Sequence, residues 1–186
     1  LLSSGSAKLR RVPYPLWNYY PRNARPPEWV DGLVQTVADA SGTISTVEQR
    51  TGLSSDEVLR ELSLGLTHLG YVVESGKTKA AKIFRPVLFG ENGVPEVSYE
   101  IDAFHDGLGV AVEVEAGRGA ANNADYRDIV RTSLILDAKY LALLMPITYR
   151  STSSIPAFSR TRQQLEAIYA SNRLKLPFEG ILLVGY

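Results

Sequence analysis

Apolar and polar residues alternate with a period of two in two segments near the middle of the chain, residues 97–104 and 109–116. This alternation predicts β-strands, because successive side chains of a strand point to opposite faces of a sheet. In the second segment the valines fall on one face, while Glu113 and Glu115 share the other. Residues 105–109, where the two segments join, include two glycines, which is typical of a hairpin turn. If the two strands pair, Asp102 of the first strand lies beside the two glutamates.

The other hydrophobic patterns predict helices placed between further strands. Apolar residues at helical spacing and helix-capping residues predict helices over 29–40, 43–50, 56–68, 122–138 and 160–173. Short apolar runs bounded by turn residues predict strands over 71–74, 83–89, 140–145 and 180–185. This order of elements indicates an α/β fold, a mixed β-sheet flanked by helices.

Residues 1–28 contain five prolines interleaved with arginines and aromatic residues, and they predict an irregular aromatic and basic arm. Such an arm either contacts nucleic acid or another subunit, or packs its rings on the body of the protein. Residues 29–55 are interpreted as a helical extension, and residues 56–186 as one α/β domain. The length of 186 residues suits a single compact domain overall.

Asp102, Glu113 and Glu115 are the strongest candidates for chemistry. A cluster of buried carboxylates is costly unless a cation or shared protons neutralise it. Carboxylate oxygens are also the ligands that Mg²⁺ prefers. The alternative is a sheet face on which alternating acids simply point to water.

An Asp on one strand, followed by a strand that carries Glu-x-Glu, resembles the PD-(D/E)XK nuclease superfamily. Asp102 takes the place of the first acid, Glu113 that of the signature acid, and Glu115 the usual lysine position. Some restriction endonucleases of this superfamily also carry Glu there, whereas Ile101 departs from the usual proline. The order of elements over residues 56–145 matches as well. The resemblance implies a restriction-endonuclease-like core that hydrolyses DNA with Mg²⁺ or Mn²⁺, as a homodimer that cuts both strands.

The resemblance also implies roles for individual residues. Asp102 and Glu113 would bind the metal directly, with the backbone carbonyl of Val114 as a further ligand. Glu115 would orient or deprotonate the attacking water in place of lysine. Glu61, on the first core helix, is expected to reach the metal site, or else to be a surface glutamate paired with a neighbour.

Seven further residues are candidates for contact with DNA, mostly through its phosphates. They are Lys77, Lys79, Lys82, Arg118, Asn122, Arg127 and Arg131. The lysines equally suit a solvated basic turn, and the two arginines of the predicted helix equally suit ion pairs along that helix.

Residues 43–62 also resemble a helix-turn-helix, in which the second helix would enter the major groove. Its outward positions, Asp56, Glu57 and Glu61, are acidic and oppose the approach of phosphates. A regulator built on this unit, or a DNA-binding protein without catalysis, is therefore the alternative to a nuclease.

The composition narrows the choice of partners and cofactors. The 20 basic and 20 acidic residues balance, so DNA binding requires local basic patches. The chain has no cysteine, which excludes disulfides, zinc-thiolate sites and cysteine nucleophiles. It shows no apolar run of about 18 residues, no secretory signal and no Gly-rich phosphate loop. We therefore expect a cytoplasmic protein with no membrane partner and no small-molecule cofactor.

Overall fold

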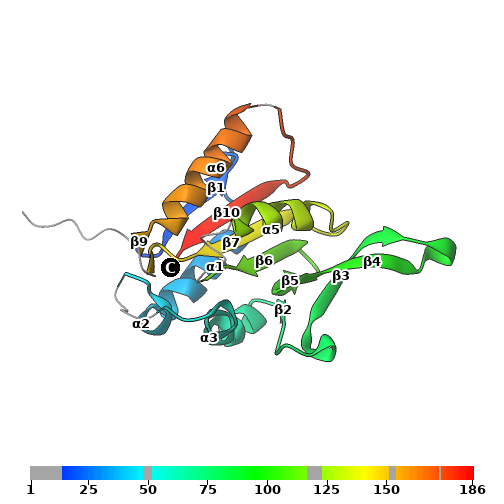
Figure 1. Ribbon diagram of the computed structural model, residues 1–186, viewed down its shortest axis with the longest axis horizontal. Coiled ribbons are helices and arrows are strands. Elements are labelled where there is room, and N and C mark those ends of the chain that lie inside the picture. Colours follow the sequence, from blue (N-terminus) through cyan, green and yellow to red (C-terminus); the bar gives the residue numbers. More distant parts are fainter. Residues whose placement is uncertain (1–13, 48–51, 117–122, 151–153, 172) are drawn as a thin grey trace, which may run out of the picture.

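The central element of the computed structural model is a six-stranded mixed sheet with the strand order β1-β10-β7-β6-β5-β2 (Figure 1). The structure describes residues 14–47, 52–116, 123–150, 154–171 and 173–186. The strands of this sheet are β1 (Leu16–Tyr20), β2 (Val72–Val73), β5 (Ala103–His105), β6 (Val110–Val114), β7 (Tyr140–Met145) and β10 (Gly180–Gly185). Strands β6, β7 and β10 run parallel, whereas the other three pair antiparallel with their neighbours.

Helices cover both faces of this sheet, so the predicted α/β class is confirmed. On one face lie α1 (Trp29–Asp39), α2 (Ser41–Ile44) and α3 (Ser55–His68), whose apolar residues share a core with the valines of β6. On the other face lie α5 (Ala124–Ser133) and α6 (Ala157–Ser171). Strands β7 and β10 are buried on both faces, which explains their nearly continuous apolar sequences. Short strands β8 (Tyr149–Arg150) and β9 (Ser154–Ile155) pair with each other before α6.

Helix α3 begins at a capping box. The Ser54 hydroxyl accepts the Glu57 N–H, and the Glu57 carboxylate accepts the Ser54 N–H at 2.8 Å. These bonds satisfy two of the backbone donors that a helix start leaves free, and they fix where the helix begins.

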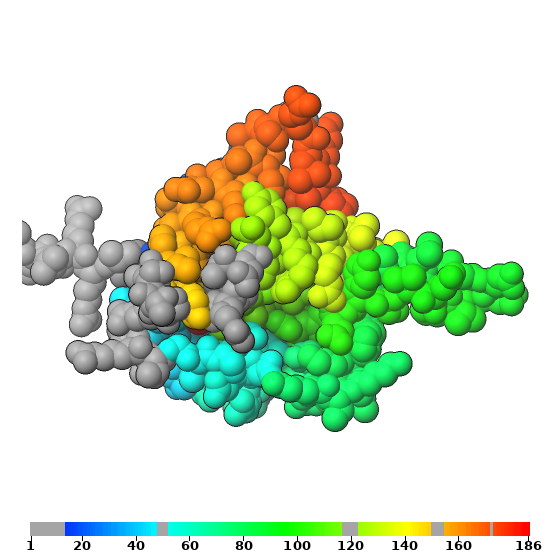
Figure 2. Space-filling model, viewed as in Figure 1, coloured from blue at the N-terminus to red at the C-terminus, as the bar shows by residue number. Residues whose placement is uncertain are grey.

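Strands β3 (Ile83–Phe89) and β4 (Pro95–Ile101) form a separate two-stranded hairpin. This hairpin projects away from the central sheet (Figure 1), and Figure 2 shows it extending beyond the rest of the surface in that view. The prediction of one strand over 97–104 is therefore wrong, because the chain bends at Asp102 and divides the segment between β4 and β5. Only the second part pairs with β6.

The prediction of an irregular arm is wrong for Leu16–Tyr20, which form edge strand β1 against β10. Tyr19 and Tyr20 point to opposite faces of the sheet and join the two cores, so their aromatic surface is buried. Prolines 15 and 21 flank the strand, in positions that an edge strand tolerates. Residues 1–13 lie outside the described residues.

Residues 29–44 pack into the first core with α3 and the sheet. The described part of the predicted helical extension therefore belongs to the body of the protein. The prediction of a second helix over 43–50 is wrong for residues 45–47, because α2 spans Ser41–Ile44 and the chain turns after it. Residues 48–51 lie outside the described residues. A membrane-crossing helix would need more length and more apolar sequence than any helix within the described ranges has.

Candidate functional site

A small cavity of about 190 Å³ opens beside β6, between α5 and the start of α3. We call it the acidic pocket. Its lining residues are Ser55, Asp56, Glu74, Lys82, Glu100, Asp102, Glu113, Val114, Glu115, Arg127, Asp128 and Arg131. Seven acidic side chains against three basic ones make the lining attractive to cations.

The pairing of β5 with β6 brings Asp102 to Glu113. Ala103 pairs with Val112, so continuing this antiparallel register by one residue sets Asp102 opposite Glu113. The Asp102 Oδ2 atom accepts the Val114 N–H at 2.7 Å, which ties the two segments together at this point.

Strand alternation turns Glu113 of β6, and Glu115 directly after β6, away from the first core. Val112 and Val114 pack into that core, whereas Glu113 and Glu115 line the acidic pocket. Both glutamates are buried, with 9% and 8% of their surface exposed. The structure thus brings Asp102, Glu113 and Glu115 to one cavity.

Burial makes these three carboxyl groups hard to ionise together. Burial raises the pKa of Asp102 to about 7, and the Val114 N–H opposes part of this shift. Burial, reinforced by the charge of Asp102, raises the pKa of Glu113 well above its usual range. For Glu115, burial and then the neighbouring Asp128 carboxyl raise the pKa to about 8. A cation in the pocket would remove this penalty.

Arg127 supplies part of that positive charge in the structure. Its Nη2 atom lies 2.8 Å from Glu115 Oε1, and its Nε atom lies 3.1 Å from Asp128 Oδ1. The Arg127 side chain is still 57% exposed, so it reaches the carboxylates from the solvent side. Arg131 also lines the pocket, with its guanidinium over the Tyr99 ring at 5.3 Å.

The three predicted lysines have different environments. Lys82 Nζ lies 3.0 Å and 2.9 Å from the two carboxylate oxygens of Glu74 and is only 18% exposed, so it neutralises acids inside the pocket. Lys77 is 85% exposed and pairs with Asp56 at 3.0 Å. Lys79 is exposed on the turn between them.

Four lining acids were not among the sequence candidates for the site: Asp56, Glu74, Glu100 and Asp128. Asp128 is buried on the face of α5 formed by Asp125, Asp128, Ile129 and Thr132. These residues recur at helical spacing, so the helical period of the sequence could have identified Asp128 as a buried residue. Glu74 follows β2 directly, and its N–H donates to the carbonyl of Asp102 at 2.9 Å. No local pattern indicated that contact.

Glu61 does not join the acidic pocket. It is exposed, because α3 buries its apolar face and Glu61 lies off that face. The first turn of the helix, with Ser55 and Asp56, reaches the pocket instead. Two other candidates, Arg118 and Asn122, lie outside the described residues.

The donor atoms of the lining suit a hard divalent cation. Its donors are carboxylate oxygens, the type that Mg²⁺ binds, and burial, followed by the charges of neighbouring carboxylates, raises the pKa values of Asp102 and Glu115. Among the residues that the structure describes, however, no group of three His, Cys, Asp or Glu side chains is already arranged to hold a metal ion.

Comparison with known proteins identifies the fold. No family model and no curated protein matches the sequence. Among solved structures, the restriction endonuclease BglII complexed with a DNA 16-mer is similar to this chain, with a TM-score of 0.51 and 15% sequence identity. The match covers 92% of this chain and 75% of that one. The chain therefore has a restriction-endonuclease-like fold.

Proposed function

We propose that the protein is a metal-dependent endonuclease that hydrolyses phosphodiester bonds in DNA. The observation that supports the proposal is the convergence of half-buried Asp102 with buried Glu113 and Glu115 in one pocket of a restriction-endonuclease-like fold. Carboxylates that are buried beside one another at this cost favour a site that a cation completes.

Asp102 and Glu113 would hold Mg²⁺ or Mn²⁺, and the backbone carbonyl of Val114 is the further proposed ligand. When bound, the ion polarises a phosphoryl oxygen and lowers the pKa of a coordinated water. The carboxylate of Glu115 accepts a proton from the attacking water. Glu115 must be ionised for this role, and a bound cation would lower its pKa from about 8 in the free protein.

The basic residues around the pocket would face the DNA backbone. Arg127 is mostly exposed while it contacts Glu115 and Asp128, so its guanidinium can turn to a phosphate when a metal ion takes over the neutralisation of the acids. Arg131, Lys77 and Lys79 are the further proposed phosphate contacts. A homodimer would supply the second site needed to cut both strands.

A plasmid-nicking assay tests the proposal. We expect the wild-type protein to convert supercoiled plasmid to nicked and linear forms in Mg²⁺ or Mn²⁺, and to leave it intact in EDTA. Equal cleavage in EDTA would exclude a metal-dependent mechanism.

A DNA-binding protein without catalysis is the second candidate. It is favoured by the absence of a ready three-residue metal group among the described residues and by the contact of Arg127 with Glu115. In the helix-turn-helix version of this candidate Glu61 points to solvent, and Glu61 is exposed in the structure. However, α3 packs its apolar face on the sheet. Calorimetric titration with Mn²⁺ separates the candidates, because a nuclease binds the ion and a pure binding protein need not.

A further inference from the structure

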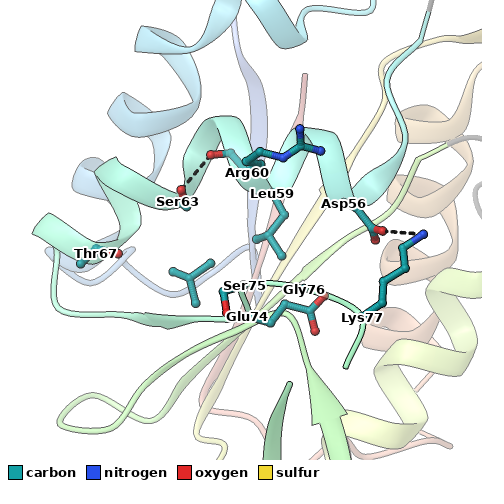
Figure 3. A pocket seen from close by; sticks show the side chains of 10 residues that line it. Asp56, Leu59, Arg60, Ser63, Thr67, Glu74, Ser75, Gly76 and Lys77 are labelled. Carbon is teal, nitrogen blue, oxygen red and sulfur yellow. Dashed lines mark hydrogen bonds and ion pairs between the residues drawn. The ribbon is translucent and has the colours of Figure 1, made fainter. Parts of the chain in front are cut away.

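A second and larger cavity, of about 460 Å³, lies next to the acidic pocket. Helix α3 forms one wall and the segment that follows β2 forms the other (Figure 3). Its lining residues are Asp56, Leu59, Arg60, Ser63, Thr67, Val73, Glu74, Ser75, Gly76 and Lys77. We call it the α3 pocket. Its volume lies within the range of sites that take small molecules or one unit of a polymer.

The two pockets are contiguous. Asp56 and Glu74 line both of them, one from the first turn of α3 and the other from the end of β2. A polymer strand with one unit at the acidic pocket would reach the α3 pocket past these two acids, whose charges are paired with Lys77 and Lys82.

The lining of the α3 pocket combines apolar, hydroxyl and cationic groups with two acids, Asp56 and Glu74, at the border with the acidic pocket. Leu59 points from the helix toward the segment around Glu74 in Figure 3, and Val73 contributes further apolar surface. Arg60 and Lys77 place positive charge at opposite walls. An apolar surface beside cations matches a nucleotide, which offers a flat base and a charged phosphate.

An ion pair now joins the two walls of the α3 pocket. Lys77 Nζ lies 3.0 Å from Asp56 Oδ2, and the two side chains are 85% and 44% exposed. An exposed pair of this kind contributes little to stability, so a phosphate can displace it at low cost.

The opposite direction out of the acidic pocket is unsuitable for a nucleic acid. Residues 86–116, which include β4 and the β5–β6 hairpin, contain no lysine or arginine. They do contain Glu91, Glu96, Glu100 and Asp106 in addition to the acids of the site. Arg85 of β3 is already paired with Asp106 at 2.8 Å, and Arg131 lies over the Tyr99 ring of β4. A phosphodiester chain leaving toward the projecting hairpin would therefore meet mainly like charge, whereas the α3 side offers Arg60 and Lys77.

We propose that the α3 pocket is the subsite for the nucleotide adjacent to the phosphodiester bond that is cleaved. Arg60 and Lys77 contact its phosphate, and its base or sugar lies on Leu59 and Val73. The proposal rests on the proposed nuclease function, and it adds a specific substrate path and Arg60 as a binding residue.

The direct test is an NMR titration of the ¹⁵N-labelled wild-type protein with thymidine 5′-monophosphate in EDTA. We expect shifts of amide signals in α3 and in the segment 73–77, and loss of these shifts in the Arg60→Ala/Lys77→Ala double variant. Shifts confined to other regions, or none at millimolar nucleotide, would overturn the proposal. Inorganic phosphate is titrated in parallel, and an identical response to it would exclude nucleotide recognition.

A second measurement uses fluorescence anisotropy of a labelled DNA duplex of mixed sequence. The duplex is bound by protein that carries Asp102→Asn, so that it is not cut. The Arg60→Ala and Lys77→Ala changes should each lower the slope of log affinity against log salt by about 1, the effect of losing one phosphate contact. The matched control is Arg173→Ala/Lys175→Ala, two exposed basic residues beyond α6, on the other face of the sheet.

An unchanged salt slope in both test variants would overturn the subsite. A different result would overturn the nuclease proposal, namely the absence of metal-dependent plasmid cleavage by the wild-type protein. Each result is therefore read independently of the other.

Discussion

At the scale of single residues, Asp102 and Glu113 carry the proposed metal binding. We expect Asp102→Asn or Glu113→Gln to abolish Mg²⁺-dependent plasmid cleavage. The fold should persist, because removing one charge from a crowded acidic pocket reduces repulsion. Cleavage is measured on plasmid and folding by thermal unfolding in EDTA. Full activity in both variants would remove these residues from the site.

Glu115 should matter for the chemical step more than for metal affinity. Loss of a general base typically slows a reaction by about 10²–10⁴-fold, and we expect Glu115→Ala to fall in this range while Mn²⁺ affinity changes less. Glu115→Lys should also be less active, because a cation beside the ion competes with it. Glu61→Ala is the matched control, since Glu61 is exposed and outside the pocket. Wild-type rates in Glu115→Ala would require another base.

At the scale of elements, the turn between β5 and β6 sets the register that brings Asp102 to Glu113. Gly109 in this turn has φ +66°, and a Cβ there would lie 2.7 Å from the backbone oxygen of Asp137. The Gly109 carbonyl also accepts the N–H groups of Lys139 and Tyr140, which anchors the turn to the start of β7.

Gly109→Ala should therefore lower the free energy of unfolding by about 2 kcal/mol, because the left-handed conformation and the close backbone contact are both unfavourable for alanine. Urea unfolding measures the change. Gly107→Ala is the control in the same turn, where the nearest atom to an added Cβ is 3.4 Å away in the His105 ring. Equal losses in the two variants would contradict the special role of position 109.

At the scale of the whole molecule, the acidic pocket should make stability depend on pH. The folded-state pKa values of about 7 for Asp102 and about 8 for Glu115 lie above those of an unfolded chain, which are about 4. The folded protein therefore binds more protons across this interval. The contribution of these groups to stability is present at low pH and is lost as the pH rises through the folded values.

We expect the melting temperature in EDTA to decrease as the pH is raised from about 5 to about 8. Mg²⁺ should increase the melting temperature more at the higher pH, where the ion takes the place of the bound protons. Differential scanning calorimetry measures both trends. Asp102→Asn should weaken the dependence on pH. A flat profile in EDTA would show that the buried acids are already neutralised by the protein.

Much of the site was predictable because strand alternation is a local property. The period of two determined that Glu113 and Glu115 share a face opposite the valines of β6, and the Gly-containing turn predicted that Asp102 would return beside them. The same local patterns predicted the parallel core strands β7 and β10, whose apolar runs allow burial on both faces.

The sequence by itself thus determined most of the strands and helices, though not edge strand β1, and which side chains share a face. Only the tertiary structure decided which faces meet. It paired β1 with the C-terminal strand β10, brought Asp128 and Glu74 to the acidic pocket, and left Glu61 outside it. It also bent the chain at Asp102, so that β4 joins β3 in the projecting hairpin. The physical reason is that periodicity reports a residue's orientation within its own element, whereas contacts between distant segments depend on how the complete set of apolar faces packs.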